Sequence, residues 1–506
     1  MKSIKYILLF ALGIIIMASC DSFLEEKPKT FLSPESYFTT EAQMEAAVDG
    51  LYSYMDDIFD GDIEVGTQRF VFLEYMTGYC TRKRQATSLY LEQANSLTVT
   101  EENNNLESLW SSAYHALENC NVAIAGIEKS NAQVPASSKN NLLGQAYFFR
   151  AYYYFNLVRL WGEIPLKITP TTNLLNTAIE LSSQSDVYNQ IVADLKKAEE
   201  LMKDLQWSNS DGHVAKAAVK SLLAKVYITM AGYPLQLGKE YYDLAYSEAK
   251  DVVTNSGISL YPSFQAMRDD NFACGGENIL TIEREPDKAS SPVHSALLPY
   301  PEVANISQNS AYGGALAPTE SFYDSYSEYD LRKADFGYMT KKYNALDGTE
   351  EINTDVPYIY KYFDMSAANN AGKSGMGYPI IRYADILLLM AEAKTMSDGG
   401  TTTDTDAINA YWQVRQRAIP ASAEESKPSS LTFETAYKER IWELCFETQT
   451  WFDMLRTRKA LDTTSGKVID LIGLQTPGHS SPFEEKDLLF PYPLREKRLN
   501  PNLVRK

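Results

Sequence analysis

The sequence has few of the residues that build metal and redox centres. Only 5 of its 506 residues are cysteine and 4 are histidine. No CxxC or HExxH motif occurs, so no ligand set has the spacing of a metal site. Isolated histidines serve more often at surfaces or helix caps than as ligands. We therefore expect no metal and no cofactor. The histidines are His115, His213, His294 and His479.

Catalytic motifs are absent as well. The sequence has no GxSxG, no GxGxxG and no kinase motif set. Glycoside hydrolysis needs only two carboxylates, and 66 acidic residues leave that chemistry open. Glu439, Glu443 and Glu447 are spaced four apart, so they share one face of a helix. Because Arg440 and Arg456 lie close by in sequence, we interpret this face as structural ion pairs and predict no catalytic residue.

Long hydrophobic runs are missing from the body of the chain. The longest apolar stretch after residue 20 covers residues 386–390, far too short to cross a bilayer. The N-terminus differs, since Lys2 and Lys5 precede an apolar run over residues 6–17 and small residues before Cys20. This pattern predicts a lipoprotein signal peptide over residues 1–19 and a lipid on Cys20. The alternative is ordinary signal cleavage that leaves Cys20 an incidental thiol.

Four cysteines remain in the body of the chain. They are too far apart in sequence to indicate a pairing, although an oxidising compartment would allow one or two disulfides. Small buried hydrophobic side chains are the alternative, above all for Cys120 and Cys445, which lie in helical patterns. The four are Cys80, Cys120, Cys274 and Cys445.

Positive charge is in deficit. The chain has 47 Lys and Arg against 66 Asp and Glu, a formal net charge of −19. A phosphate backbone would repel so acidic a protein, which argues against nucleic acid as a partner. Hydrophobic residues make up 44%, enough to bury a sizeable core and to exclude disorder.

Tyrosine, by contrast, is abundant, with 34 Tyr against 20 Phe and 6 Trp. A tyrosine ring has an apolar face and a polar hydroxyl, which suits a solvent-exposed binding surface. We assign most tyrosines to the core, including those of the aromatic stretch over residues 147–155.

Apolar residues recur with helical spacing over most of the chain. Two helix pairs, one around residues 214–249 and one around 380–418, carry small residues where helices would cross. They resemble tetratricopeptide repeats, and generic helix pairs fit equally well. Helices are predicted over residues 41–55, 106–127, 139–161, 187–205, 214–230, 380–396 and 433–456.

Residues 256–378 differ from the rest. They are rich in Gly, Pro, Asn and Tyr and show few periodic runs apart from short strands predicted over 278–282 and 358–362. Long irregular segments with aromatic residues are usually functional. The predicted fold is mainly α, with repeat-like helix pairs and a loop-rich ligand-binding region containing a few short strands.

Several segments, in their order and spacing, resemble the SusD/RagB family of surface lipoproteins over nearly the whole chain. The one departure is Thr448-Gln449-Thr450, where the family often has a glycine and a basic residue. The segments that carry the resemblance are residues 20–28, 38–41, 46–52, 146–166, 382–393, Asn409 with 414–418, 439–440, 443–444, 451–453, 491–493 and 500–503.

The resemblance implies a non-enzymatic, glycan-binding lipoprotein of the outer-membrane surface. It implies capture of an oligosaccharide or polysaccharide and its delivery to a SusC-like TonB-dependent transporter. It also implies one SusD-like domain over residues 20–506, with a helical scaffold over about 40–255 and 380–457 and an insertion over about 256–378. A peptide- or protein-binding scaffold of the same transporter class is the alternative, and a tethered glycosidase is a weaker one.

No motif carries the ligand residues, so we choose them from irregular, polar surroundings. Aromatic rings stack on sugar faces and polar groups reach sugar hydroxyls. Each choice has the alternative of a loop residue that packs on the core. The predicted ligand contacts are Tyr79, Arg82, Tyr300, Asn309 and Tyr312.

Overall fold

The computed structural model describes residues 37–59, 69–83, 89–172, 178–209, 211–308 and 313–505. Cys20, Asn309 and Tyr312 lie outside these ranges, so the predictions made for them stay predictions. The described chain is mainly α-helical, as predicted, and its strands are short. Among the described residues, the helices fall short of the length and apolar character needed to span a bilayer.

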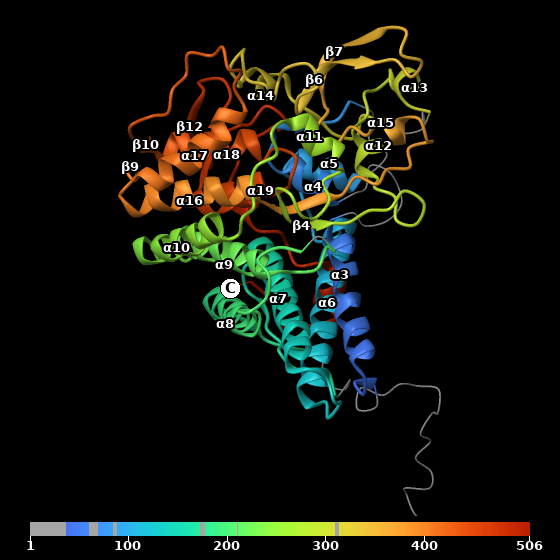
Figure 1. Ribbon diagram of the computed structural model, residues 1–506, viewed down its shortest axis with the longest axis vertical. Coiled ribbons are helices and arrows are strands. Elements are labelled where there is room, and N and C mark those ends of the chain that lie inside the picture. Colours follow the sequence, from blue (N-terminus) through green and yellow to red (C-terminus); the bar gives the residue numbers. More distant parts are fainter. Residues whose placement is uncertain are drawn as a thin grey trace, which may run out of the picture.

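Long helices pack in series and form what we call the helical scaffold (Figure 1). Successive helices of the scaffold contact one another. Helix α10 contacts α16, although the insertion separates the two in sequence. The small side chains of Ala217, Ala224, Ala245 and Ala249 are buried between helices, as the repeat-like pattern requires. The scaffold consists of α3 (Glu41–Phe59), α6 (Asn104–Lys129), α7 (Ala136–Trp161), α8 (Gln184–Leu201), α9 (Lys216–Ala231), α10 (Lys239–Asn255), α16 (Tyr383–Ser397), α17 (Thr405–Arg417), α18 (Phe433–Glu443) and α19 (Gln449–Thr457).

Helix α7 contains 4 of the 34 tyrosines, at positions 147 and 152–154. It contacts α3, α6 and α8, so it is buried on nearly all sides. The Tyr153 hydroxyl donates to the Leu51 carbonyl at 2.5 Å, and the Tyr154 hydroxyl donates to the Lys167 carbonyl at 2.6 Å. These rings are packing residues, as predicted.

The predicted helix over 433–456 is wrong in its middle, because α18 ends at Glu443 and α19 begins at Gln449. Phe446 and Thr448 between them have positive φ values of 65° and 57°. Side chains distant in sequence bind the backbone of this break. Lys361 Nζ donates to the Glu443 and Cys445 carbonyls at 3.0 Å each, and the Tyr362 hydroxyl donates to the Phe446 carbonyl at 2.9 Å. Tertiary contacts thus override the helical periodicity.

The prediction for residues 380–396 is wrong at its start, since residues 380–382 belong to strand β8 (Tyr378–Arg382). This strand pairs antiparallel with β4 (Asn278–Ile282), which confirms the strand predicted there. Both strands are buried throughout, so their side chains do not alternate between polar and apolar and the pattern resembles a buried helix.

The loop-rich insertion lies at the top of Figure 1. Its hairpin pairs β6 (Met339–Asn344) with β7 (Glu351–Ile359), so the predicted strand over 358–362 is right only for its first two residues. A small apolar core that includes Leu298, Tyr343 and Phe363 supports the loops. The insertion also contains α11 (Phe264–Asp269), α12 (Val293–Leu297), α13 (Val303–Ile306), β5 (Ala317–Pro318), α14 (Glu320–Asp324) and α15 (Met365–Ala368).

The remaining elements are short. Two-stranded sheets pair β1 (Cys80–Thr81) with β5, β2 (Ile164–Pro165) with β3 (Leu181–Ser182), β9 (Thr401–Thr402) with β10 (Leu431–Thr432), and β11 (Lys459–Asp462) with β12 (Lys467–Asp470). The short helices are α4 (Arg69–Tyr75), α5 (Leu89–Asn95), the 3₁₀ turn η2 (Glu485–Leu488) and α20 (Leu494–Leu499).

The four cysteines of the described chain are unpaired. Cys80, Cys120 and Cys445 are buried, and Cys274 is partly buried. Burial raises the pKa of the Cys445 thiol to about 12, so this side chain is a neutral, inert packing group. The interpretation as buried hydrophobic residues is therefore right for Cys120 and Cys445.

Candidate functional site

Three segments come together in what we call the loop surface, residues 80–83, 296–301 and 313–318, and the first two carry the predicted ligand residues Arg82 and Tyr300. The Lys83 amide donates to the Gly314 carbonyl at 3.0 Å, and the Gly314 amide donates to the Leu298 carbonyl at 2.8 Å. Strand β1 pairs with β5 in the same place. The structure therefore brings Arg82, Tyr300 and the residues that follow Tyr312 onto neighbouring segments.

Gly313 allows this close approach. It has a φ of +125°, and a Cβ atom there would lie 2.9 Å from the Leu298 carbonyl oxygen. A side chain would strain the backbone and push the two segments apart. From beneath, the Tyr75 hydroxyl of α4 donates to the Ala315 carbonyl.

Tyr300 presents part of its ring to solvent, with 40% of the residue exposed. Its backbone is held from below, because the Tyr358 hydroxyl donates to the Tyr300 carbonyl at 2.6 Å. Arg82 is 33% exposed at its side chain and is paired with Glu92 of α5. The structure thus gives a partly exposed tyrosine and a partly exposed arginine, both on supported segments.

Tyr79 is placed differently. Only 2% of it is exposed, its ring stacks on Phe322 with the centroids 4.9 Å apart, and its hydroxyl donates to the Leu461 carbonyl at 2.9 Å. Both ring and hydroxyl are engaged inside the protein, so the structure gives no support to Tyr79 as a ligand contact. Its Gly-Tyr-Cys context looks like a loop in the sequence, but Gly78 lies against Thr476 and turns Tyr79 inward.

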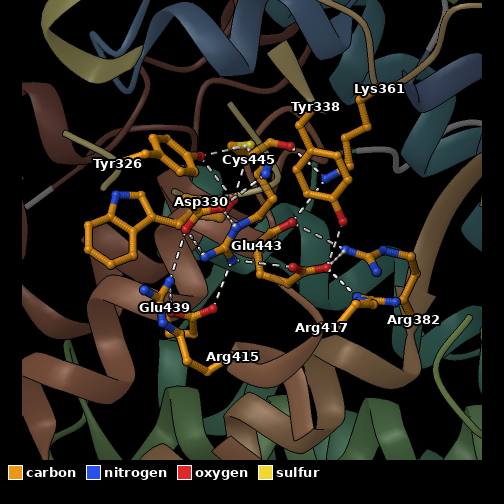
Figure 2. A network of polar contacts seen from close by, with 12 residues as sticks. Tyr326, Asp330, Tyr338, Lys361, Arg382, Arg415, Arg417, Glu439, Glu443 and Cys445 are labelled. Atoms are coloured by element: carbon orange, nitrogen blue, oxygen red, sulfur yellow. Dashed lines mark hydrogen bonds and ion pairs between the residues drawn. The ribbon is translucent and has the colours of Figure 1, made fainter. Parts of the chain in front are cut away.

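A buried charge cluster, the insertion network, joins the insertion to the helical scaffold (Figure 2). Arg382 pairs with Glu277, Glu443 and Glu447 at 2.5, 3.1 and 2.6 Å, and Arg417 pairs with Glu443 at 2.7 Å. The network has five carboxylates and five cations, all with buried side chains: Glu277, Asp330, Glu439, Glu443 and Glu447, and Arg332, Lys361, Arg382, Arg415 and Arg417.

The charges of the insertion network are matched. Burial alone would raise the pKa of Glu443, but Arg417, Arg382 and Arg332 lower it to about 2. Fully paired carboxylates cannot act as a general acid or nucleophile. The Glu439, Glu443 and Glu447 face is therefore a structural ion-pair face, as predicted, although its partners are not Arg440 and Arg456.

Metal binding finds no support in the described chain, where no group of three or more His, Cys, Asp or Glu side chains is arranged to hold an ion. Asp404 accepts a hydrogen bond from the Ala407 amide at 2.9 Å and caps α17.

Comparison with known proteins decides the family. One family model, described as "Starch-binding associating with outer membrane", matches residues 22–228, and a second, described as "SusD family", matches residues 307–506. The crystal structure of a SusD superfamily protein from Parabacteroides distasonis is 31% identical, covers 92% of this chain and 98% of its own, and superposes with a TM-score of 0.84. The chain belongs to the SusD/RagB family.

Other relatives agree over the full length. SusD-like protein P2 of Formosa agariphila is 27% identical over 99% of this chain and 98% of its own. The surface glycan-binding protein A of Bacteroides thetaiotaomicron, solved with laminarihexaose, is 19% identical and shares the fold with a TM-score of 0.72, over 92% of this chain and 99% of its own. The predicted fold class is confirmed. As a SusD/RagB member, the chain is a binding protein and not an enzyme.

Proposed function

We propose that this SusD/RagB member is a cell-surface lipoprotein, anchored in the outer membrane through Cys20, that captures oligosaccharides and delivers them to a SusC-like TonB-dependent transporter. Residues 20–506 are proposed to form one domain, in which the insertion network holds the loop-rich insertion on the helical scaffold. The single observation that carries the binding proposal is the loop surface, where the partly exposed residues Tyr300 and Arg82 lie on neighbouring segments.

The chemistry of the loop surface suits a neutral sugar. The ring face of Tyr300 can stack on the C–H face of a pyranose, and the Arg82 guanidinium can donate hydrogen bonds to its hydroxyls. A neutral ligand needs no basic patch, so a net charge of −19 is compatible with it. Two structures of the same fold were solved with oligosaccharides, one with a xylogluco-oligosaccharide and one with laminarihexaose.

A binding screen of the full chain against an oligosaccharide panel tests this function, with product analysis of each bound glycan. We expect at least one glycan to bind and to be recovered intact. Recovery of cleaved glycan would contradict a purely binding role. Peptide binding in a parallel panel, with no glycan bound, would favour the peptide-binding scaffold instead.

A further inference from the structure

A second buried charge cluster, the repeat cluster, lies within the helical scaffold. Arg440 pairs with Asp385 and Asp453 at 3.0 Å each, and Arg456 pairs with Glu392 at 2.5 Å and with Asp453 at 2.8 Å. Lys225 completes the cluster through Asp385. Three cations thus meet three carboxylates, and the charges cancel.

Two further arginines, Arg159 and Arg458, lie at the edge of the repeat cluster without a carboxylate. Within the described residues, neither has an acidic group at ion-pair distance. The carboxylates that interact electrostatically with Arg159 are Asp453 and Asp385, and both already form ion pairs with Arg440. Elsewhere in the described chain, Arg150 pairs with Asp194, and the arginines of both charge clusters are likewise paired with carboxylates.

The Arg159 guanidinium is held rigidly by neutral groups. It lies between the rings of Phe155 and Phe452, 3.9 and 3.6 Å from their centroids. Its Nε donates to the Phe155 carbonyl at 3.0 Å, and its Nη2 donates to Asn156 Oδ1 at 2.8 Å. The remaining N–H groups of this planar, fixed guanidinium can still donate hydrogen bonds.

Arg159 and Arg458 line the same cavity, which we call the arginine niche. It has a volume of about 40 Å³, and its wall also includes Gln184, Thr229 and Tyr233. The niche forms where the end of α9 meets the end of α19, since the Tyr233 amide donates to the Arg456 carbonyl at 2.8 Å. A Cβ atom at Gly232 would lie 2.3 Å from that carbonyl oxygen, so only glycine permits the contact. Tyr233 is 40% exposed, which places the niche at the surface.

The arginine niche has the size and charge for one small anion. A single water needs a cavity of about 10–15 Å³ by the same measure, so about 40 Å³ leaves room for a group of a few heavy atoms. Burial lowers the pKa of Arg159 to about 10 and also lowers the pKa of Arg458, in the latter case against the charge of Glu485. Buried charges are normally paired, and guanidinium groups bind planar oxyanions with two parallel hydrogen bonds.

We propose that the arginine niche binds a carboxylate group between Arg159 and Arg458. The niche shares no residue with the loop surface, so the proposal goes beyond glycan capture and does not depend on it. The carboxylate can be free or carried by an acidic sugar, and both present the same planar group.

Saturation-transfer NMR on the acetate methyl group, recorded with the full chain at constant ionic strength, tests the proposal. We expect acetate to give a saturable signal and acetamide, its neutral analogue of the same shape, to give none. Arg458→Gln should weaken acetate binding about tenfold, because it removes one charged pair of donors. Arg498→Gln, at an exposed arginine of α20, should leave it unchanged.

Arg159→Lys provides a second variant that keeps the charge but loses the fork, and we expect it to weaken acetate binding as well. Glucuronate in place of acetate identifies the source, since its binding assigns the niche to acidic sugars and its failure assigns it to free carboxylates. The proposal is overturned if acetate gives no saturable signal, if acetamide matches it, or if both arginine variants bind acetate as the wild type does.

Discussion

Tyrosine has different roles in the helical scaffold and on the loop surface. Tyr153 and Tyr154 are buried on α7, with their hydroxyls bound to backbone carbonyls. Tyr300 has its backbone held by Tyr358, while 40% of the residue stays exposed. The difference teaches that the surroundings of the ring, not the abundance of tyrosine, mark a ligand surface.

Charged side chains follow the same division. In the scaffold and at its junction with the insertion, carboxylates and cations are matched within two buried clusters, whereas Arg82 on the loop surface is partly exposed with a single exposed partner. Buried pairs specify how elements fit together, and exposed ones remain available for ligands.

Among the variants that test this comparison, Arg382→Met in the insertion network should cause the largest loss of stability. The substitution leaves Glu277, Glu443 and Glu447 with one buried cation fewer, and losing one partner of a buried network costs about 3–5 kcal/mol. Urea unfolding measures the change in the free energy of unfolding. Arg498→Met, at an exposed position, should change it by less than about 0.5 kcal/mol. Equal effects of the two variants would contradict a structural role for the network.

Glu74→Gln should change the pH dependence of stability. Burial raises the pKa of Glu74 from 4.5 to about 7 in the folded state, although the hydrogen bond from the Thr448 amide acts to lower it. The folded chain then holds this proton more tightly than the unfolded chain. The stability contribution is therefore complete below pH 4.5 and is lost as the pH rises through 7, by about 3 kcal/mol.

The difference between wild type and variant isolates this group, since His294 and His479 titrate equally in both. We expect Glu74→Gln to gain stability relative to wild type between pH 4.5 and 7, measured by urea unfolding at each pH. Glu424→Gln, at an exposed glutamate, should follow the wild-type curve. Parallel curves for Glu74→Gln and wild type would show that Glu74 is not buried as a neutral acid.

A smaller effect is expected from Tyr153→Phe. It leaves the buried Leu51 carbonyl without its hydroxyl donor, which costs about 1–2 kcal/mol. Tyr329→Phe removes a hydroxyl that donates to Glu425 at the surface, and it should cost less than about 0.5 kcal/mol. Thermal unfolding of the two variants measures both losses of stability. A larger loss in Tyr329→Phe than in Tyr153→Phe would contradict the distinction between packing and surface tyrosines.

The sequence was sufficient for features set by local periodicity. Helices α3, α6, α7 and α8 follow from spacing and residue type. The break between α18 and α19 could not be predicted, because Lys361 and Tyr362 bind its carbonyls from more than 80 positions away. The arginine niche could not be predicted either, because it forms only where the ends of α9 and α19 meet.

The candidate site was predicted in part for the same reason. The irregular contexts of Arg82 and Tyr300 indicated exposed positions, and both side chains are accessible. Tyr79 has an equally irregular context, yet Phe322 and Leu461 cover it. Only contacts between distant segments separate the two tyrosines, and no local pattern encodes them.

The most direct test of the account is the affinity of Tyr300→Ala for the tightest-binding oligosaccharide of the panel, compared with Tyr329→Ala as a control of similar exposure. Isothermal titration calorimetry on folded variants should show at least a tenfold loss for Tyr300→Ala, because the aromatic platform is removed, and no change for Tyr329→Ala. Wild-type affinity in Tyr300→Ala would contradict the assignment of the loop surface as the glycan-binding site.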